Sequence, residues 1–142
     1  MRNMRKGRLP LLAALLLAAA LALGSWLTPE HRAERYAEAH RETLQADMDA
    51  FFLRGEPLRY DAGLEAVNHW PGEHPMVEYL LPTLRPGYYG FYYSPDDVPL
   101  AFQNAAVPLE AAGRGWSWRA EGDNHGFTRR LSPRWYYFEA HF

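Results

Sequence analysis

Residues 135–142 read WYYFEAHF, the last of several short aromatic runs in a chain of 142 residues. Successive side chains of a β-strand point to opposite faces of a sheet. A strand here therefore places Tyr136, Phe138, Ala140 and Phe142 on one face. We predict that this face packs in a core.

Similar runs precede it, and turn signals separate them. Pro95 is the second residue of Ser94–Asp97, which is typical of a type I turn. Residues 122–126, GDNHG, have the composition of a hairpin loop. These signals predict a C-terminal antiparallel sheet of four or five strands. The runs that would form it are residues 87–93, 100–103, 116–121, 127–132 and 135–142.

An amphipathic helix is predicted before this half. Thr28 and Pro29 suit the N-cap and the first helical position, and Gly55 suits the stop. Between them apolar or weakly polar residues recur at steps of three and four, which predicts one helix from Pro29 to Leu53. With this helix against one face of the sheet, the fold class is α+β. The stripe consists of Ala33, Tyr36, Ala37, His40, Leu44, Met48, Phe51 and Phe52.

The middle of the chain, residues 56–86, is interrupted by prolines and predicts no long element. We expect Asp61 to cap a short helix through Leu64 and Val67. We expect another turn or two at Met76 to Leu81. The prolines are Pro57, Pro71, Pro75, Pro82 and Pro86.

The first 27 residues predict export. Four basic residues precede Leu9–Leu27, a run of 19 residues without a charged side chain. Its length suits a membrane helix, which needs about 17–25 residues, with Trp26 at the interface. Its Leu/Ala core also suits a cleavable signal peptide, whose apolar region has roughly 7–15 residues. We favour the anchor. The basic residues are Arg2, Arg5, Lys6 and Arg8.

Both readings place the rest of the chain across the membrane from these basic residues. An anchor predicts an inner-membrane protein with its domain on the periplasmic side. A cleaved signal predicts a secreted or periplasmic protein. The predicted organisation is a signal-anchor or signal peptide at 1–27, an amphipathic helix or stalk at 28–55, and a small aromatic-rich α+β domain at 56–142.

Charge and cysteine content exclude several classes of function. Four of the 15 basic residues lie in the leader, so 11 remain against 17 acidic residues and the net charge there is −6. Such a domain repels phosphate backbones, and we expect no nucleic-acid partner. The chain has no cysteine, which excludes disulfides, thiolate metal sites, a thiol nucleophile and a lipid-modified cysteine.

Two clusters contain residue types that can support chemistry. His69, Glu73 and His74 are zinc-ligand types, although their spacing matches no familiar metal motif. Asp123 and His125 are the types of an acid–base pair, but no GxSxG elbow accompanies them. We expect loop roles for both clusters, and predict no catalytic residue, metal or cofactor.

The aromatic residues also offer a candidate binding surface. Most of the rings are expected in the core. The alternative is an exposed platform that stacks on sugar rings or receives a protein partner. Its members would be Trp135, Tyr137, Tyr89 and Tyr93.

The order of elements resembles that of a type IV pilin or pseudopilin, with an N-terminal membrane helix, an amphipathic continuation and an antiparallel sheet. Gly7 corresponds to the end of a prepilin leader. However, Arg8 follows it, and Leu12 stands where pilins carry a glutamate. The resemblance is therefore one of element order, and it implies an assembly subunit.

Together these features predict a membrane-anchored envelope protein whose small extracytoplasmic domain contacts an envelope protein or a cell-wall glycan. A pilin-like subunit is the first alternative. A secreted hydrolase or metal-dependent enzyme is the second.

Overall fold

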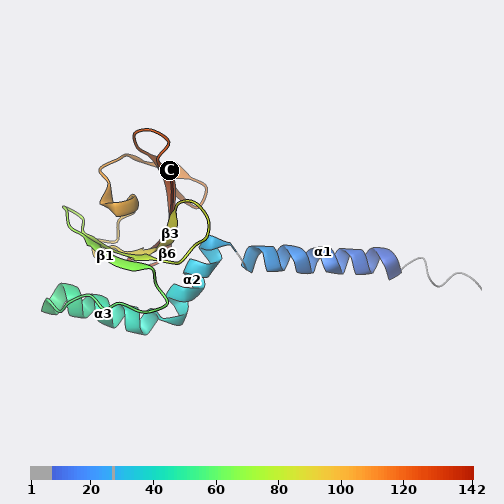
Figure 1. Cartoon of the computed structure of the whole chain (residues 1–142), viewed down its shortest axis with the longest axis horizontal. Coiled ribbons are helices and arrows are strands. Elements are labelled where there is room, and N and C mark those ends of the chain that lie inside the picture. Colours follow the sequence, from blue (N-terminus) through green and yellow to red (C-terminus); the bar gives the residue numbers. More distant parts are fainter. Residues whose placement is uncertain (1–7, 27) are drawn as a thin grey trace, which may run out of the picture.

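The chain was analysed as a computed structural model that describes residues 8–26 and 28–142, with side chains for 11–24 and 28–142. Helix α1 (Arg8–Trp26) projects from a domain made of α2 (Pro29–Ala39), α3 (Arg41–Arg54) and one antiparallel sheet (Figure 1). The α+β prediction is therefore confirmed.

The sheet has seven strands in the order β1-β2-β3-β7-β6-β5-β4. Each strand runs antiparallel to its neighbours. In chain order the strands are β1 (Ala66–Trp70), β2 (Met76–Leu80), β3 (Tyr88–Tyr93), β4 (Leu109–Ala112), β5 (Gly115–Arg119), β6 (His125–Ser132) and β7 (Trp135–His141).

The prediction of four or five strands was too low because residues 56–86 contain β1 and β2. Their prolines bound the strands instead of excluding them. Pro71 and Pro75 lie in the β1–β2 turn, and Pro82 and Pro86 lie in the β2–β3 loop. A proline beside a short strand removes no ladder hydrogen bond.

Three local predictions were wrong. Asp61 caps a turn, accepting a hydrogen bond from the Gly63 N–H at 3.0 Å, and no helix follows, since Val67 lies in β1. Most of the expected turn at residues 76–81 is β2 and not helical. The expected strand at 100–103 is irregular and enters the short 3₁₀ helix η1 (Phe102–Asn104). The hairpin around 122–126 is confirmed, because β5 pairs with β6 across it.

The ends of the amphipathic helix are as predicted, but its middle is broken. Thr28 caps α2 by accepting a hydrogen bond from the His31 N–H at 3.2 Å. Gly55 ends α3 in the left-handed conformation. At His40 the backbone leaves helical geometry, and its ring Nδ1 lies 2.9 Å from the Tyr36 carbonyl oxygen. A side chain bonded to a helix carbonyl competes with the regular ladder, which explains the separation of α2 from α3.

Both faces of the sheet are buried. Helices α2 and α3 cover one face, whereas residues 94–108, which we call the strap, cover the other (Figure 1). The predicted core residues Tyr136, Phe138 and Ala140 lie under the strap and are at most 2% exposed. Phe142 was also placed in that core, but it follows the last strand and is 60% exposed.

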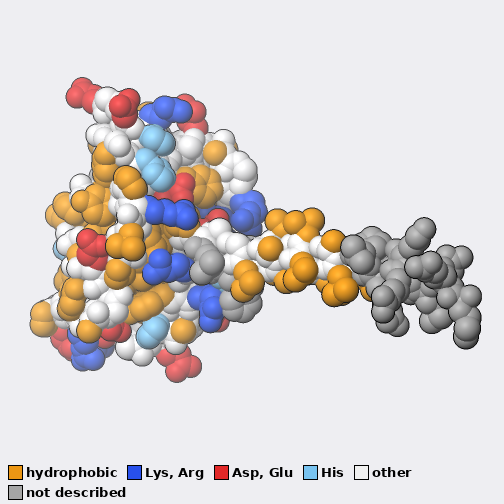
Figure 2. Space-filling model, turned by 45° about the vertical axis from the view of Figure 1, so that its right-hand side comes forward, with side chains coloured by type: hydrophobic (Ala, Val, Ile, Leu, Met, Phe, Trp, Pro, Cys, Tyr) orange, Lys and Arg blue, Asp and Glu red, His pale blue; other side chains and the backbone are white. Residues whose placement is uncertain are grey.

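Helix α1 lies apart from the domain, and its leucines are 58–69% exposed (Figure 2). Within the described residues no single helix is both long and apolar enough for a membrane span. Only residues 11–24 together with α2, two helices at 65° to each other, reach that length and composition. The predicted interfacial side chain of Trp26 and the basic side chains before α1 lie outside the described residues.

A buried carboxyl group holds the strap against the sheet. Glu78, on β2, is 0% exposed and accepts hydrogen bonds from the Gln103 N–H at 3.0 Å and from Trp70 Nε1 at 3.3 Å. Burial raises the pKa of Glu78 to about 7, although these two donors act to lower it. The folded protein therefore holds this proton more tightly than the unfolded chain does.

Replacement Glu78→Gln is expected to remove a pH dependence of stability. In the wild type the free energy of unfolding falls as the pH rises from about 4.5 to about 7, because the carboxyl must ionise while buried. The fall is on the order of 3 kcal/mol. Urea denaturation, followed by tryptophan fluorescence at several pH values, measures it in both proteins.

Glu73→Gln is the matched control, since Glu73 is exposed in the neighbouring β1–β2 turn. It should keep the wild-type pH profile. If Glu78→Gln also keeps that profile, the buried carboxyl does not cause it.

Candidate functional site

The predicted aromatic platform is buried, which corrects that prediction. Trp135, Tyr137, Tyr89 and Tyr93 are 1–6% exposed and belong to the core beneath α2 and α3. Alternation correctly predicts that Trp135 and Tyr137 share one face of the sheet. Helices α2 and α3 cover this face. These four rings contribute to packing and do not form an exposed platform.

The structure does not bring the possible zinc ligands of the histidine-rich turn together. His74 Nδ1 lies 2.9 Å from Asp96 Oδ2, whereas the ring of His69 packs edge-on against Phe51. Within residues 8–26 and 28–142 no group of three His, Cys, Asp or Glu side chains is arranged to hold a metal ion.

The alternative of an acid–base pair at Asp123 and His125 is not supported either. His125 Nδ1 lies 2.6 Å from the backbone oxygen of Asp123, and its ring stacks on His141 with centroids 5.2 Å apart. The Asp123 carboxylate is not the partner in this contact. His125 therefore shapes the β5–β6 turn.

A groove between the helices and residues 58–64 is the strongest candidate binding site. It has a volume of about 320 Å³ and lies where α2 meets α3. We call it the tyrosine groove, because Tyr36, Tyr60 and Tyr79 line it. Pockets that hold small ligands typically start at about 300 Å³. Its other main lining side chains are His40, Asp47, Arg59 and Asp61.

The polar groups of the tyrosine groove are fixed in place. The Tyr36 hydroxyl donates to Asp61 Oδ2 at 3.0 Å, and the Tyr36 ring stacks on His40 at 4.2 Å. Burial and the Asp61 carboxylate raise the pKa of Tyr36 to about 12. The Gly63 N–H and Tyr36 hold the pKa of Asp61 below its usual value. At neutral pH the groove thus presents a neutral phenol beside a carboxylate.

Opposite this pair the groove is open. Tyr60 is 63% exposed, and its hydroxyl donates to the Leu64 carbonyl oxygen at 2.5 Å, so the residue is anchored at its hydroxyl while it remains largely accessible to solvent. The Arg59 Nη1 atom lies 3.6 Å from Asp47 Oδ1. An aromatic face with a carboxylate and a guanidinium nearby can stack on a ligand and hydrogen-bond its hydroxyl groups.

Sequence reasoning found only part of this groove. Tyr36 and His40 lie on the predicted helical stripe, and Asp61 was read as a cap. Tyr60 and Arg59 were missed because they lie in a stretch without periodicity. Only the folding of that stretch back over the helix junction brings them together.

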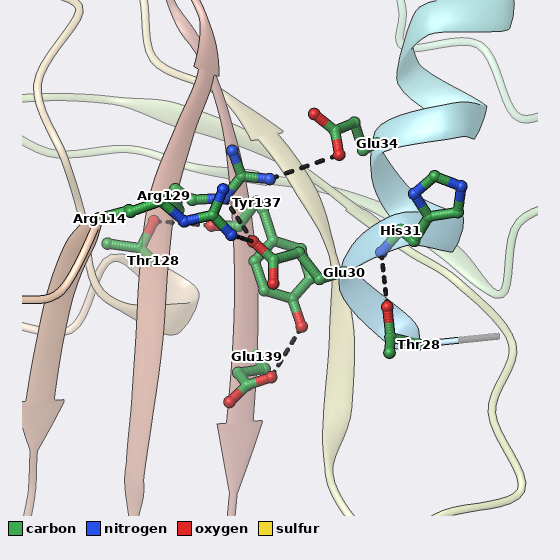
Figure 3. A network of polar contacts seen from close by, with 9 residues as sticks. All are labelled: Thr28, Glu30, His31, Glu34, Arg114, Thr128, Arg129, Tyr137 and Glu139. Carbon is green, nitrogen blue, oxygen red and sulfur yellow. Dashed lines mark hydrogen bonds and ion pairs between the residues drawn. The ribbon is translucent and has the colours of Figure 1, made fainter. Parts of the chain in front are cut away.

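A second polar cluster joins the start of α2 to the sheet (Figure 3). Glu30, in the first turn of α2, accepts from Arg129 Nε on β6 and lies 3.6 Å from Arg114 Nη2. The Arg129 Nη2 atom also lies 3.5 Å from Glu34 Oε2. The Arg129 side chain is only 12% exposed, so water screens this pair less than a surface pair.

Coupling between Arg129 and Glu30 should be measurable by a double-mutant cycle with Arg129→Met and Glu30→Gln. We expect a coupling of about 1–2 kcal/mol in the free energy of unfolding, between the values typical of exposed and of buried pairs. Chemical denaturation of the four proteins gives this number.

The control cycle uses Arg41 and Glu38, whose side chains are 58% and 64% exposed. That pair should show less than about 0.5 kcal/mol. Equal coupling energies in both cycles would contradict the inference that the burial of Arg129 strengthens its pairing with Glu30.

No protein-family model, curated protein or solved structure matches this chain. Its function is therefore argued from its own residues.

Proposed function

We propose that this chain is a non-enzymatic envelope protein, held in the inner membrane by α1, whose periplasmic domain binds a partner through the tyrosine groove. The observation that carries the proposal is the exposure of α1. Seven leucines, spread around this helix, are 58–69% exposed and do not pack on the domain.

A helix that is apolar on all sides needs an apolar environment. Moving a leucine side chain out of water gains about 1.5–3 kcal/mol, so leaving seven of them in water is costly. Helix α1 has 19 residues, or ~28 Å at the usual rise. The hydrocarbon core of a bilayer is about 30 Å thick. Although no single described helix is long and apolar enough for a span by itself, the exposed leucines favour placing α1 in the bilayer.

The tyrosine groove supports binding more than catalysis. Its polar groups pair with one another or with the backbone, as Tyr36 does with Asp61 and Tyr60 with Leu64. Such groups orient a ligand without transferring a proton. A cell-wall glycan suits the open ring of Tyr60 best, because sugar rings stack on aromatic faces and bring many hydroxyl groups. A partner protein in the envelope is the alternative occupant.

A pilin-like subunit is the second candidate function, supported by the order of a leading helix and an antiparallel sheet. A pilin spine is one continuous helix, whereas α1 and α2 are separate elements with a cap at Thr28. This break is the reason to rank the pilin reading second.

Membrane retention tests the main proposal. Full-length protein should pellet with membranes, resist alkaline carbonate and keep an intact N-terminus by mass spectrometry. Double replacement Leu15→Arg and Leu16→Arg should release it from that fraction, because an arginine at the centre of a membrane helix costs about 2.5–3.5 kcal/mol.

Leu53→Arg is the control, because Leu53 is 79% exposed at the end of α3 and should not affect retention. Cleavage between residues 20 and 24 would show that the leader is a signal peptide and not an anchor. Cleavage after Gly7 would favour the pilin-like reading.

Glycan binding by the groove is tested by sedimentation with purified cell-wall sacculi. Tyr60→Ala should reduce the bound fraction at least about fivefold, because stacking on an aromatic ring contributes on the order of 1 kcal/mol or more. Tyr60→Phe should retain binding, since the ring face remains.

Phe142→Ala removes an aromatic side chain of similar exposure, 60%, outside the groove and should bind like the wild type. Equal sedimentation of Tyr60→Ala and wild type would exclude the groove as a glycan site.

A further inference from the structure

The β2–β3 loop lies beside the point where α1 joins the domain (Figure 1). Pro29, the first residue of α2, lines the same hollow as Thr83, Arg85 and Gly87, with a volume of about 170 Å³. Leu84, between two of these residues, is fully exposed. An apolar side chain thus protrudes beside the base of α1.

Arginines surround this position. Figure 2 shows Arg side chains on the domain around the base of α1. Arg32 lies over the Tyr89 ring at 5.6 Å, and both Arg32 and Arg85 act to lower the pKa of Tyr89, which places both cations near its hydroxyl. Arg114 Nη2 lies 3.6 Å from Glu30 in the first turn of α2, and the Arg114 side chain is 78% exposed.

The acidic groups on this surface already have partners. Glu30 contacts Arg129 and Arg114, and Glu34 contacts Arg129. Glu139 accepts a hydrogen bond from the Tyr137 hydroxyl at 2.7 Å and lies 3.5 Å from His141. Arg32, Arg85 and Arg114 remain exposed, although the chain after the leader carries a net charge of −6.

Chain connectivity keeps this surface close to the end of α1. Only residues 27 and 28 separate α1 from α2 in the sequence. The last residue of α1 and the first of α2 are therefore three Cα–Cα steps apart, which span at most about 11 Å. If α1 is the membrane anchor proposed above, the surface that carries Leu84 and the arginines lies at the level of the lipid headgroups.

We propose that this surface is a docking site for anionic phospholipid headgroups, with Leu84 inserted at the interface. Arg32, Arg85 and Arg114 pair with headgroup phosphates through their planar donor groups. Leu84 enters the boundary between headgroups and acyl chains, where a single apolar side chain adds to the affinity. The inference rests on the proposed anchoring by α1 and adds a defined orientation of the domain.

Single-cysteine labelling tests this directly, because the chain has no cysteine of its own. Leu84→Cys and Leu53→Cys, both at exposed positions, are labelled with an environment-sensitive fluorophore in the full-length protein. The two proteins are reconstituted into vesicles of phosphatidylcholine alone or with phosphatidylglycerol.

In vesicles with phosphatidylglycerol, the label at position 84 should shift its emission to shorter wavelength. Brominated lipid should quench it at least about twofold more than the label at position 53, which lies at the far end of α3. With the double replacement Arg85→Gln and Arg114→Gln, the emission and quenching of the label at position 84 should no longer differ between the two lipid compositions. Arg54→Gln with Arg59→Gln, away from α1, should leave it unchanged.

The outcomes separate this inference from the proposed function. A chain that does not float with vesicles contradicts the anchoring itself. A chain that floats while labels 84 and 53 behave alike overturns only the docking surface. Insertion of label 84 that is equal in both lipid compositions overturns the recognition of anionic headgroups.

Discussion

A single sheet with aromatic side chains on both faces must be covered twice, and the rest of the domain depends on that requirement. Phe91 and Tyr92 are neighbours on β3 and therefore point to opposite faces, yet both are 0% exposed. Tyr136 and Tyr137 repeat this on β7. Burying such a ring contributes about 2–3 kcal/mol, so a sheet with one bare face would lose much of its stabilisation.

The two covers are attached in different ways. Helices α2 and α3 pack on one face through an apolar stripe that includes Ala33, Leu44 and Met48. The strap packs Ala101 and Phe102 into the core on the other face and adds buried polar bonds. Its Leu100 N–H donates to the Tyr92 hydroxyl at 2.8 Å, and its Gln103 N–H donates to Glu78. A short connection that lacks periodicity can thus seal a core.

This difference explains how much of the fold the sequence could predict. The helical stripe, its cap at Thr28 and its stop at Gly55 are local signals, and the structure has them. The burial of Trp135 and Tyr137 is not local, because alternation tells which side chains share a face and not what covers that face. The platform prediction failed for this reason. The tyrosine groove was missed likewise, since Tyr60 reaches Tyr36 only through the tertiary fold.

The contact between Glu30 and Arg129 gives the domain a defined relation to its N-terminal helix. It fixes the first turn of α2 on β6, and the Arg129 side chain is mostly buried there. Because α2 begins two residues after α1, a fixed start of α2 limits where α1 can leave the domain. The start of α2 touches both regions, because Pro29 lines a hollow with Thr83 and Arg85 and Glu30 lies 3.6 Å from Arg114 Nη2. A buried ion pair contributes little net stability after its desolvation cost, but it favours one geometry over others. Here the favoured geometry fixes the point of the domain from which the chain leads back to α1.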